Sequence, residues 1–117
     1  MMYRLSYTLV LCIVFSCTSK SIDLPNFDES AWQTDKDGCN GVRFEMRDNL
    51  IKVKSDLKGL NGDQVTAVLG KPNKTNLASR NQKYFIYNIA CPKESEETST
   101  LSIRFNATGL VYEVVVF

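Results

Sequence analysis

Gly59-Leu60-Asn61-Gly62-Asp63-Gln64-Val65, continuing to Leu69-Gly70-Lys71-Pro72, is the stretch that decides the fold. Asn61 has the side chain of a helix N-cap, and Gln64 follows three residues later, where it can reach back in a capping box. Gly70 accepts the left-handed conformation that ends helices, and Pro72 cannot continue one. The stretch therefore predicts a short helix that begins after Asn61 and ends before Gly70.

A longer helix is predicted immediately upstream. Apolar residues recur there at steps of four, four, three and four, which is the spacing that lines one face of a helix. They are Val42, Met46, Leu50, Val53 and Leu57. The charged residues between them, from Arg43 to Asp56, are expected mostly to face water, and Gly59 is the expected end of this helix.

Strands are predicted downstream of the two helices. Residues 83–91 are rich in Tyr, Phe and Ile, and residues 101–105 alternate between apolar and polar side chains, as half-buried strands do. Residues 106–109 form a hairpin-compatible turn, and residues 110–117 are the returning strand. The prediction is an α+β domain with two helices packed on one face of a three-stranded antiparallel meander.

The last predicted strand is apolar on both faces. Simple alternation separates its residues into two sets, namely Leu110, Tyr112, Val114 and Val116 on one face, and Val111, Val115 and Phe117 on the other. Two helices can cover only one face of a small sheet. The second face is therefore expected to be covered either by the N-terminal extension around Phe27 and Trp32 or by a partner protein or lipid.

The N-terminus has the features of an export signal. Arg4 precedes a short apolar run, and Val14-Phe15-Ser16-Cys17 resembles a lipobox, in which Cys17 would become the lipidated first residue of the mature protein. The alternatives are an ordinary signal peptide, or a buried strand, with an incidental cysteine. The predicted organisation is a signal peptide at 1–16, a lipidated cysteine and tether at 17–31, and the α+β domain at 32–117. Such a protein would be exported and anchored in the outer membrane, facing the periplasm.

The cysteines divide according to this prediction. Cys12 leaves with the signal and Cys17 carries lipid, so Cys39 and Cys91 remain in an oxidising compartment, where a disulfide between them is expected. The alternatives are two free buried thiols or a metal pair. A metal pair is disfavoured because the chain has no histidine and no CxxC spacing.

Composition excludes several functions. The chain has 14 basic and 13 acidic residues, so it lacks the basic excess that nucleic-acid binding requires. Without histidine or a phosphate-binding loop, no catalytic, cofactor or metal residue is predicted, and the protein is expected not to be an enzyme. The remaining carboxylate groups, Asp35 with Asp37, and Glu94 with Glu96 and Glu97, are interpreted as solvated charges in a turn and a polar loop.

The motifs together resemble one family. The G-L-N-G-D-Q-V segment at 59–65 with L-G-K-P at 69–72, the aromatic strand at 84–87 and the hairpin at 101–111 are similar to the signature of the SmpA/OmlA (BamE-like) small lipoprotein family. The similarity covers about Val53 to Val116. It implies an outer-membrane lipoprotein that supports envelope assembly or integrity by binding other proteins. The chain departs from the family pattern before Val53, where Trp32 and the turn from Asp35 to Cys39 replace a short lead-in.

The predicted function is that of a non-catalytic protein-interaction module, with envelope proteins, including outer-membrane assembly components, as partners. The alternatives are a binding protein for a lipid or small apolar ligand, and an inhibitor-type domain, because the fold resembles the two-helix, three-strand unit of the β-lactamase inhibitor protein. A partner module should present a flat surface, whereas a ligand-binding protein needs a concave apolar pocket. The residues expected to border the contact surface are Tyr84 or Tyr87, Tyr112, and the segment 75–83 with Arg80 and Lys83. Which of the tyrosines face outward depends on the strand register.

Overall fold

The computed structural model describes residues 24–92 and 99–117 of the 117-residue chain. The predicted signal peptide and Cys17 lie outside the described residues. The same holds for the three glutamates of the polar loop, Glu94, Glu96 and Glu97.

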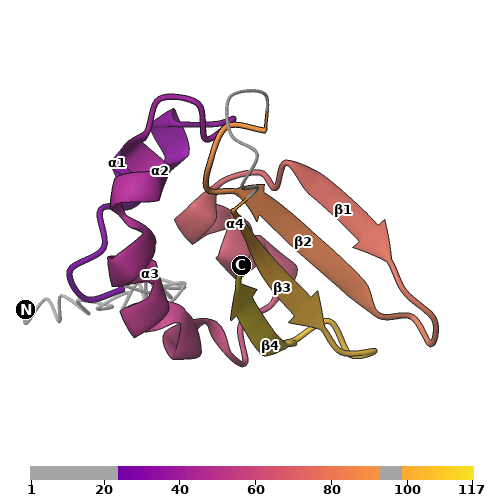
Figure 1. Cartoon of the computed structure of the whole chain (residues 1–117). Coiled ribbons are helices and arrows are strands. Elements are labelled where there is room, and N and C mark those ends of the chain that lie inside the picture. Colours follow the sequence, from indigo (N-terminus) through magenta and orange to yellow (C-terminus); the bar gives the residue numbers. More distant parts are fainter. Residues whose placement is uncertain (1–23, 93–98) are drawn as a thin grey trace, which may run out of the picture.

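Helices precede strands along the chain (Figure 1). The helical elements are α1 (Glu29–Thr34), α2 (Val42–Glu45), α3 (Arg47–Val53), the 3₁₀ helix η1 (Lys54–Leu57) and α4 (Gly62–Leu69). The strands are β1 (Lys74–Leu77), β2 (Lys83–Asn88), β3 (Thr100–Phe105) and β4 (Val111–Val116). The predicted α+β class is correct, but the described residues contain a further helix, α1, and a further strand, β1.

The strands form a four-stranded antiparallel sheet in the order β1-β2-β3-β4. The three predicted strands are present as β2, β3 and β4, and β1 pairs with β2 through the register Lys74↔Ile86 to Leu77↔Lys83. All four residues of β1 are exposed, so this strand has no alternation of buried and exposed side chains. The prediction of three strands is wrong for that reason, since periodicity detects only strands with one buried face.

Helix α4 has the predicted ends. The Asn61 side chain accepts a hydrogen bond from the Gln64 backbone N–H, the Gln64 side chain accepts one from the Asn61 N–H, and both distances are 2.9 Å. This reciprocal pair satisfies two of the N–H groups that a helix start leaves free. At the other end Gly70 has a φ of 77°, in the region that favours glycine. The corner between η1 and α4 is thus fixed by local chemistry.

The predicted longer helix is divided into α2, α3 and η1, which follow one another with only Met46 outside them. Its apolar positions face the core as the spacing predicts: Met46, Leu50, Val53 and Leu57 are buried, and Val42 is partly buried. The helical layer packs these side chains against the apolar face of the sheet. The sheet contributes Phe85, Tyr87, Leu101, Ile103, Phe105, Val111 and Val114 to the same core, and Ile89 joins it from directly after β2.

A β-bulge changes the faces of β4. Phe105 pairs with Val111 and Arg104 pairs with Glu113, so Tyr112 is the additional residue on β4. Val111 and Val114 are consequently both buried, and Tyr112 is exposed. The assignment of faces by simple alternation is wrong, because the bulge shifts the period by one residue at Tyr112.

The N-terminal extension joins the helical layer and does not cover the second face of the sheet. Leu24 and Phe27 are buried, and the ring of Trp32 lies 5.6 Å from that of Phe27 and 6.4 Å from that of Tyr87, which is on the helix-covered face. The Trp32 indole N–H also donates to the Leu69 carbonyl at 3.1 Å. The part of the predicted tether that the structure describes is therefore packed on the domain, and the expectation that this extension covers the second face is wrong.

Candidate functional site

The face of the sheet opposite the helices carries an aromatic and cationic group of side chains. We call Tyr84, Arg104, Tyr112 and Gln82 the platform. Tyr84 of β2 and Arg104 of β3 are register partners, and the bulge brings Tyr112 of β4 to the other side of Arg104. The platform therefore depends on the strand register and on the bulge together.

Arg104 is held between the two tyrosine rings. Its guanidinium carbon lies 5.4 Å from the Tyr84 ring centroid and 5.0 Å from that of Tyr112, within the range of cation–π attraction. The Arg104 Nε and Nη2 atoms donate to the Gln82 side-chain oxygen at 3.0 and 2.7 Å, and the Tyr112 hydroxyl donates to the same oxygen at 3.2 Å. The guanidinium is thus oriented by neutral groups.

Among the described residues no carboxylate forms a salt bridge with Arg104, although Glu113 is its register partner on β4. A guanidinium has five N–H donors in a fixed planar arrangement, and only those directed at Gln82 have partners here. Tyrosine and arginine are also the residues over-represented among the strongest contacts of protein interfaces. The platform is therefore suited to bind a carboxylate on another molecule.

The structure separates the residues predicted to border the contact surface. Tyr84 and Tyr112 belong to the platform, whereas Arg80 lies in the connection between β1 and β2. Lys83 is on the helix-covered side, where its Nζ lies 5.1 and 5.0 Å from the ring centroids of Phe85 and Phe105.

Tyr87 is a core residue and not a surface residue. It is fully buried, its hydroxyl donates to the Gly70 carbonyl at 2.8 Å, and burial raises its pKa while Arg43 opposes that rise. Its inclusion in the contact surface is wrong because it has the same parity along β2 as the buried Phe85.

A second constellation joins residues 24–46, which we call the cap, to the rest of the fold. Its centre is Arg43, which is only 2% exposed. The Arg43 Nε donates to the Trp32 carbonyl at 2.9 Å, and Nη1 donates to the Asn73 side chain and to the Asn88 carbonyl, both at 3.1 Å. The guanidinium also lies 4.6 Å from the Trp32 ring. The expectation that Arg43 faces water is wrong: it connects α1, α2 and β2 with the segment before β1.

Asp35 is likewise buried and not a solvated turn residue, being 1% exposed. Its two carboxylate oxygens each accept a backbone N–H at 3.0 Å, one from Asn40 and one from Arg43. Burial by itself raises the pKa of Asp35, but these backbone bonds and the charge of Arg43 outweigh it and lower the pKa below its usual value. The carboxylate is a structural acceptor that organises the start of α2.

Replacing Asp35 with Asn should lower the free energy of unfolding at pH 7 by about 1–3 kcal/mol, because one of two charge-assisted hydrogen bonds is lost. The folded-state pKa is lower than the unfolded one, so the stabilisation is complete above about pH 3.9 and disappears as the pH falls through the folded-state pKa. Urea unfolding at a series of pH values from 7 downward measures the loss of stability at pH 7 and the way in which that loss depends on pH. The difference between wild type and Asp35→Asn should shrink below about pH 4, and a constant difference would contradict the assignment.

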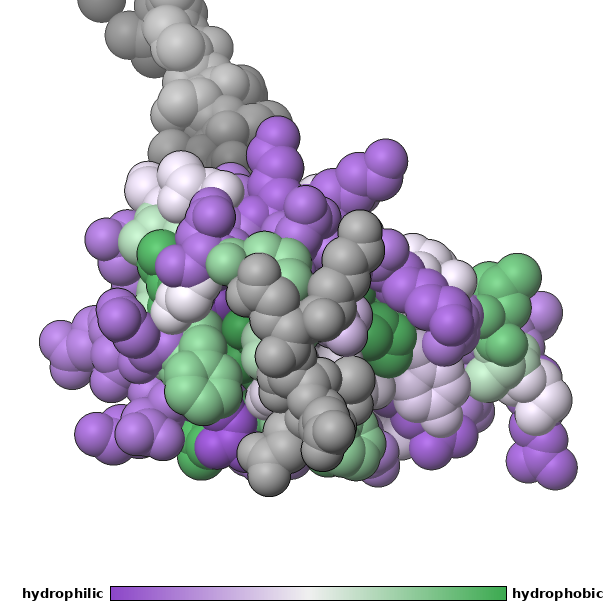
Figure 2. Space-filling model, turned by 45° about the horizontal axis from the view of Figure 1, so that its top comes forward, coloured by the Kyte–Doolittle hydropathy of each residue, from purple (hydrophilic) through white to green (hydrophobic). Residues whose placement is uncertain are grey.

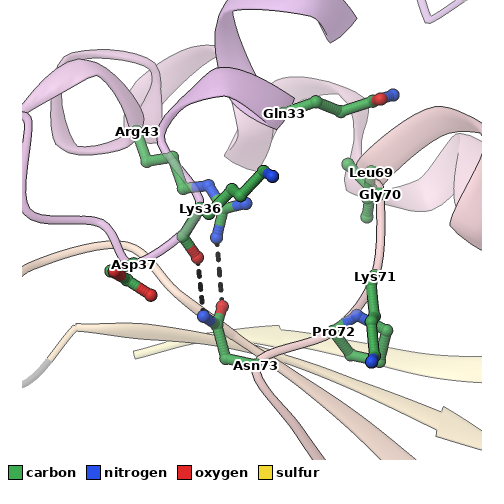
Figure 3. Close-up of a pocket in the computed structure, with 9 residues that line it drawn as sticks. All are labelled: Gln33, Lys36, Asp37, Arg43, Leu69, Gly70, Lys71, Pro72 and Asn73. Carbon is green, nitrogen blue, oxygen red and sulfur yellow. Dashed lines mark hydrogen bonds between the residues drawn. The ribbon is translucent and has the colours of Figure 1, made fainter.

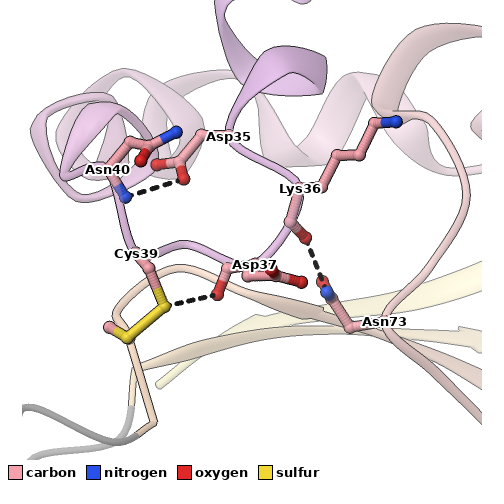
Figure 4. The surroundings of a disulfide bond; sticks show 7 residues. Asp35, Lys36, Asp37, Cys39, Asn40 and Asn73 are labelled. Carbon is pink, nitrogen blue, oxygen red and sulfur yellow. Dashed lines mark hydrogen bonds between the residues drawn. A yellow bond between two sulfur atoms is a disulfide. The ribbon is translucent and has the colours of Figure 1, made fainter.

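The expected disulfide links the cap to the chain after β2 (Figure 4). Cys39 and Cys91 are joined with a Cα–Cα distance of 4.2 Å, so these two thiols are not free or metal-bound in this structure. Gly38, beside Cys39, has a φ of 72°, and a Cβ at this position would lie 3.0 Å from the Asn88 carbonyl oxygen. Only glycine allows the cap to approach β2 this closely.

A depression of about 340 Å³ lies between the cap and the segment after α4 (Figure 3). Its wall carries the charged residues Lys36, Asp37, Arg43 and Lys71 together with polar Gln33 and Asn73. Pockets that bind apolar ligands are lined mainly by hydrophobic and aromatic side chains. This depression does not have that character, and the alternative of a small apolar ligand gains no support from it.

The described residues include no group of three or more His, Cys, Asp or Glu side chains arranged to hold a metal ion. Within the same residues, no helix has both the length and the apolar composition needed to cross a membrane.

The sequence did not indicate Arg104, Arg43 and Asn73 as members of these two constellations, whereas Gln82 lies in the 75–83 segment that was expected to border the contact surface. Arg104 could have been found from its outward position in the alternating strand beside the tyrosines, once the register was known. For Arg43 there was no signal, because a helical pattern treats an arginine between apolar positions as a solvent-facing residue.

A helical layer on one face of an antiparallel sheet, with an aromatic and cationic platform on the other face, defines a small α+β domain suited to bind another macromolecule. Residues 50–114 match the family described as the Outer membrane protein assembly factor BamE domain, and because the match covers more than half of the 117 residues, the chain belongs to this BamE family. The resemblance noted from the motifs is thereby confirmed.

Other comparisons add little. The chain is similar to the solved structure of the putative osmotically inducible lipoprotein OsmE, at 16% identity and a TM-score of 0.43, over 59% of this chain and 84% of that chain. Among curated proteins none matches. The BamE match begins inside α3, so the cap lies before the matched region, whereas the platform lies within it.

Proposed function

We propose that this protein is a non-catalytic interaction module of the cell envelope, and that it binds a protein partner of the outer-membrane assembly type through the platform. Membership of the BamE family supports the envelope setting, since the family is described by an assembly factor of outer-membrane proteins. The platform supports binding through a surface rather than through a pocket, because its residues lie on the open face of the sheet.

The observation that carries the proposal is the oriented but unneutralised guanidinium of Arg104. Two tyrosine rings and the Gln82 amide fix its position, and no described carboxylate neutralises it. Fixing a guanidinium in advance lowers the entropic cost of forming a bidentate bond with a carboxylate. The partner surface is accordingly expected to present an Asp or Glu side chain, or a chain-terminal carboxylate, opposite Arg104.

The mode of attachment is part of the proposal. Cys17 would carry lipid and hold the domain at the periplasmic side of the outer membrane, with residues 18–23 as the connection to the cap. A lipid anchor restricts the domain to the membrane surface, and this raises its effective concentration near membrane-embedded partners.

The test is to replace Tyr84 and Tyr112 with Ala, singly and together, and to crosslink the full-length protein in native membranes. Each single change should reduce the yield of the specific partner adduct about tenfold or more, as removal of an interface anchor of about 2 kcal/mol would. The free energy of unfolding should change by less than about 0.5–1 kcal/mol, because both side chains are partly exposed and lie outside the core.

Phe44 offers a matched control, since it is an aromatic residue on α2 with 58% exposure and lies away from the platform. Phe44→Ala should leave the adduct unchanged. Equal adduct yields for the platform variants and wild type, at equal protein levels, would show that the partner binds elsewhere. Loss of folding in the platform variants would show that these tyrosines are structural.

A further inference from the structure

The free edge of the sheet at β1 has unpaired backbone groups. β1 and β2 pair in a single register, and the Ala78 N–H donates to the Gln82 carbonyl at 2.8 Å in that same register. Hydrogen-bonded residues alternate along an antiparallel strand, so Lys74 and Asn76 bond to β2. The N–H and C=O groups of Thr75 and Leu77 therefore point away from the sheet, and none of the described strands pairs with them.

This edge is accessible and ends in an apolar side chain. All four residues of β1 are exposed, and Leu77 is 86% exposed. In Figure 1 the β1–β2 hairpin extends beyond the helical layer, and Figure 2 shows hydrophobic atoms at that end of the molecule, bordered by hydrophilic ones. Short length and edge lysines protect such edges in part, and β1 has four residues with one lysine, Lys74. Within β1 itself, however, there is no bulge and no proline, and its residues are exposed, so it can still accept a further strand.

The stretch of chain that forms this edge carries charges of one sign. Residues 64–92 contain no Asp or Glu, and their charged residues are Lys71, Lys74, Arg80 and Lys83. The whole chain is close to neutral, so the absence of acidic residues from this stretch is a local feature. Such a field attracts acidic partners and repels basic ones.

Arg80 adds a backbone feature. Its φ of 64° is in the left-handed region, which non-glycine residues adopt at a cost, and Asn81 beside it has a φ of 60°. Asn is enriched in this conformation and arginine is not. Arg80 thus adopts, at the end of the hairpin, a backbone conformation that asparagine or glycine would adopt at lower cost.

We propose that β1 is the docking site for an acidic, extended segment of a partner protein, which adds to the sheet as a further strand beside β1. The backbone groups of Thr75 and Leu77 would form the new ladder, the Leu77 side chain would contact an apolar residue of the segment, and Lys74 and Arg80 would face its carboxylates. This site is additional to the platform and uses different groups. A membrane surface is the less favoured occupant, because lipid offers no ordered set of donors and acceptors for the strand edge.

The experiment uses the full chain without its signal and an N-acetylated, C-amidated peptide of sequence TEVEVET, with TKVKVKT as the matched basic peptide. Amide NMR spectra should show shifts and slowed hydrogen exchange at Thr75 and Leu77 with the acidic peptide and none with the basic one. Thr75→Pro removes an outward-pointing N–H and should abolish these effects. Thr75→Ala keeps that N–H and should bind like wild type.

The charge variant Lys74→Glu/Arg80→Glu provides a second test that leaves every backbone donor in place. It should weaken binding of the acidic peptide at least tenfold and allow the basic peptide to bind. Failure of the acidic peptide to bind at millimolar concentration, or equal binding to Thr75→Pro, overturns the proposal. Binding of wild type to phosphatidylcholine–phosphatidylserine vesicles without peptide binding would assign the surface to membranes instead. No outcome depends on the platform partner, so failure here is distinguishable from failure of the proposed function.

Discussion

Replacing Arg43 with Ala is expected to lower the free energy of unfolding by about 3–5 kcal/mol, the largest effect of any single change considered. The side chain is almost fully buried, and its removal leaves the carbonyl groups of Trp32 and Asn88 without their donors. Each unsatisfied buried acceptor costs about 1–3 kcal/mol. The contact of the guanidinium with the Trp32 ring is lost as well. Urea unfolding followed by Trp32 fluorescence measures the change, because Trp32 is the single tryptophan of the chain.

Two further variants separate the hydrogen bonds of Arg43 from its charge. Arg43→Lys keeps the charge but cannot reach three acceptors with a fixed planar group, so it should recover only part of the loss. Arg47→Ala removes an arginine from the next helix and should change stability by less than about 0.5–1 kcal/mol. If Arg43→Ala is as stable as Arg47→Ala, the hydrogen bonds at Arg43 do not hold the cap in place.

Removal of the Cys39–Cys91 disulfide should have the second largest effect. The two cysteines are 52 positions apart. Closing a loop of that length in the unfolded chain is worth about 4 kcal/mol in the chain-entropy model. Cys39→Ala/Cys91→Ala should therefore lower the free energy of unfolding by roughly that amount, measured by urea unfolding without reductant.

Reduced wild type is the control for this double variant. Wild type treated with reductant and the double variant should unfold at similar urea concentrations, whereas the double variant itself should not respond to reductant. A double variant as stable as oxidised wild type would mean that the disulfide contributes nothing to global stability. Peptide mapping of protein from the envelope should identify the Cys39–Cys91 link directly.

The helical corner could be predicted from sequence because its determinants are local. Asn61 and Gln64 form the capping box from side chains three positions apart, and Gly70 ends α4 through its own backbone conformation. The core positions of the helical layer could be predicted for the same reason, since the spacing of Leu50, Val53 and Leu57 alone places them on one face of the helix.

The missed elements depend on contacts that are distant in sequence. Burial of Arg43 requires acceptors as far away as Asn88, 45 positions along the chain, and no local pattern contains that information. β1 is held by pairing with β2 and has no buried face. α1 has one buried residue, Trp32, in six positions, too few to show a helical period.

The candidate site was predictable in part. Tyr84 and Tyr112 were expected near the contact surface, and they lie on the open face of the sheet. Tyr87 could not be assigned correctly without the register, because its face depends on the pairing of β2 with β3. Tyr112 reaches Arg104 only because of the bulge in β4, which simple alternation does not predict.

The disulfide also determines how the domain would respond to mechanical force. A pull applied at the N-terminal end, as by a membrane anchor working against a load on β3 or β4, would enter the fold through α1 and reach Cys39. It would then pass across the sulfur bridge to Cys91, and the residues between these cysteines would carry none of it. α2, α3, α4, β1 and β2 all lie inside this closed ring, so only the chain outside the ring could lengthen under load. The edge at β1, together with Tyr84 and Gln82 of the platform, therefore lies inside the ring and outside this path of force, while β3 and β4, with Arg104 and Tyr112, lie on the loaded side.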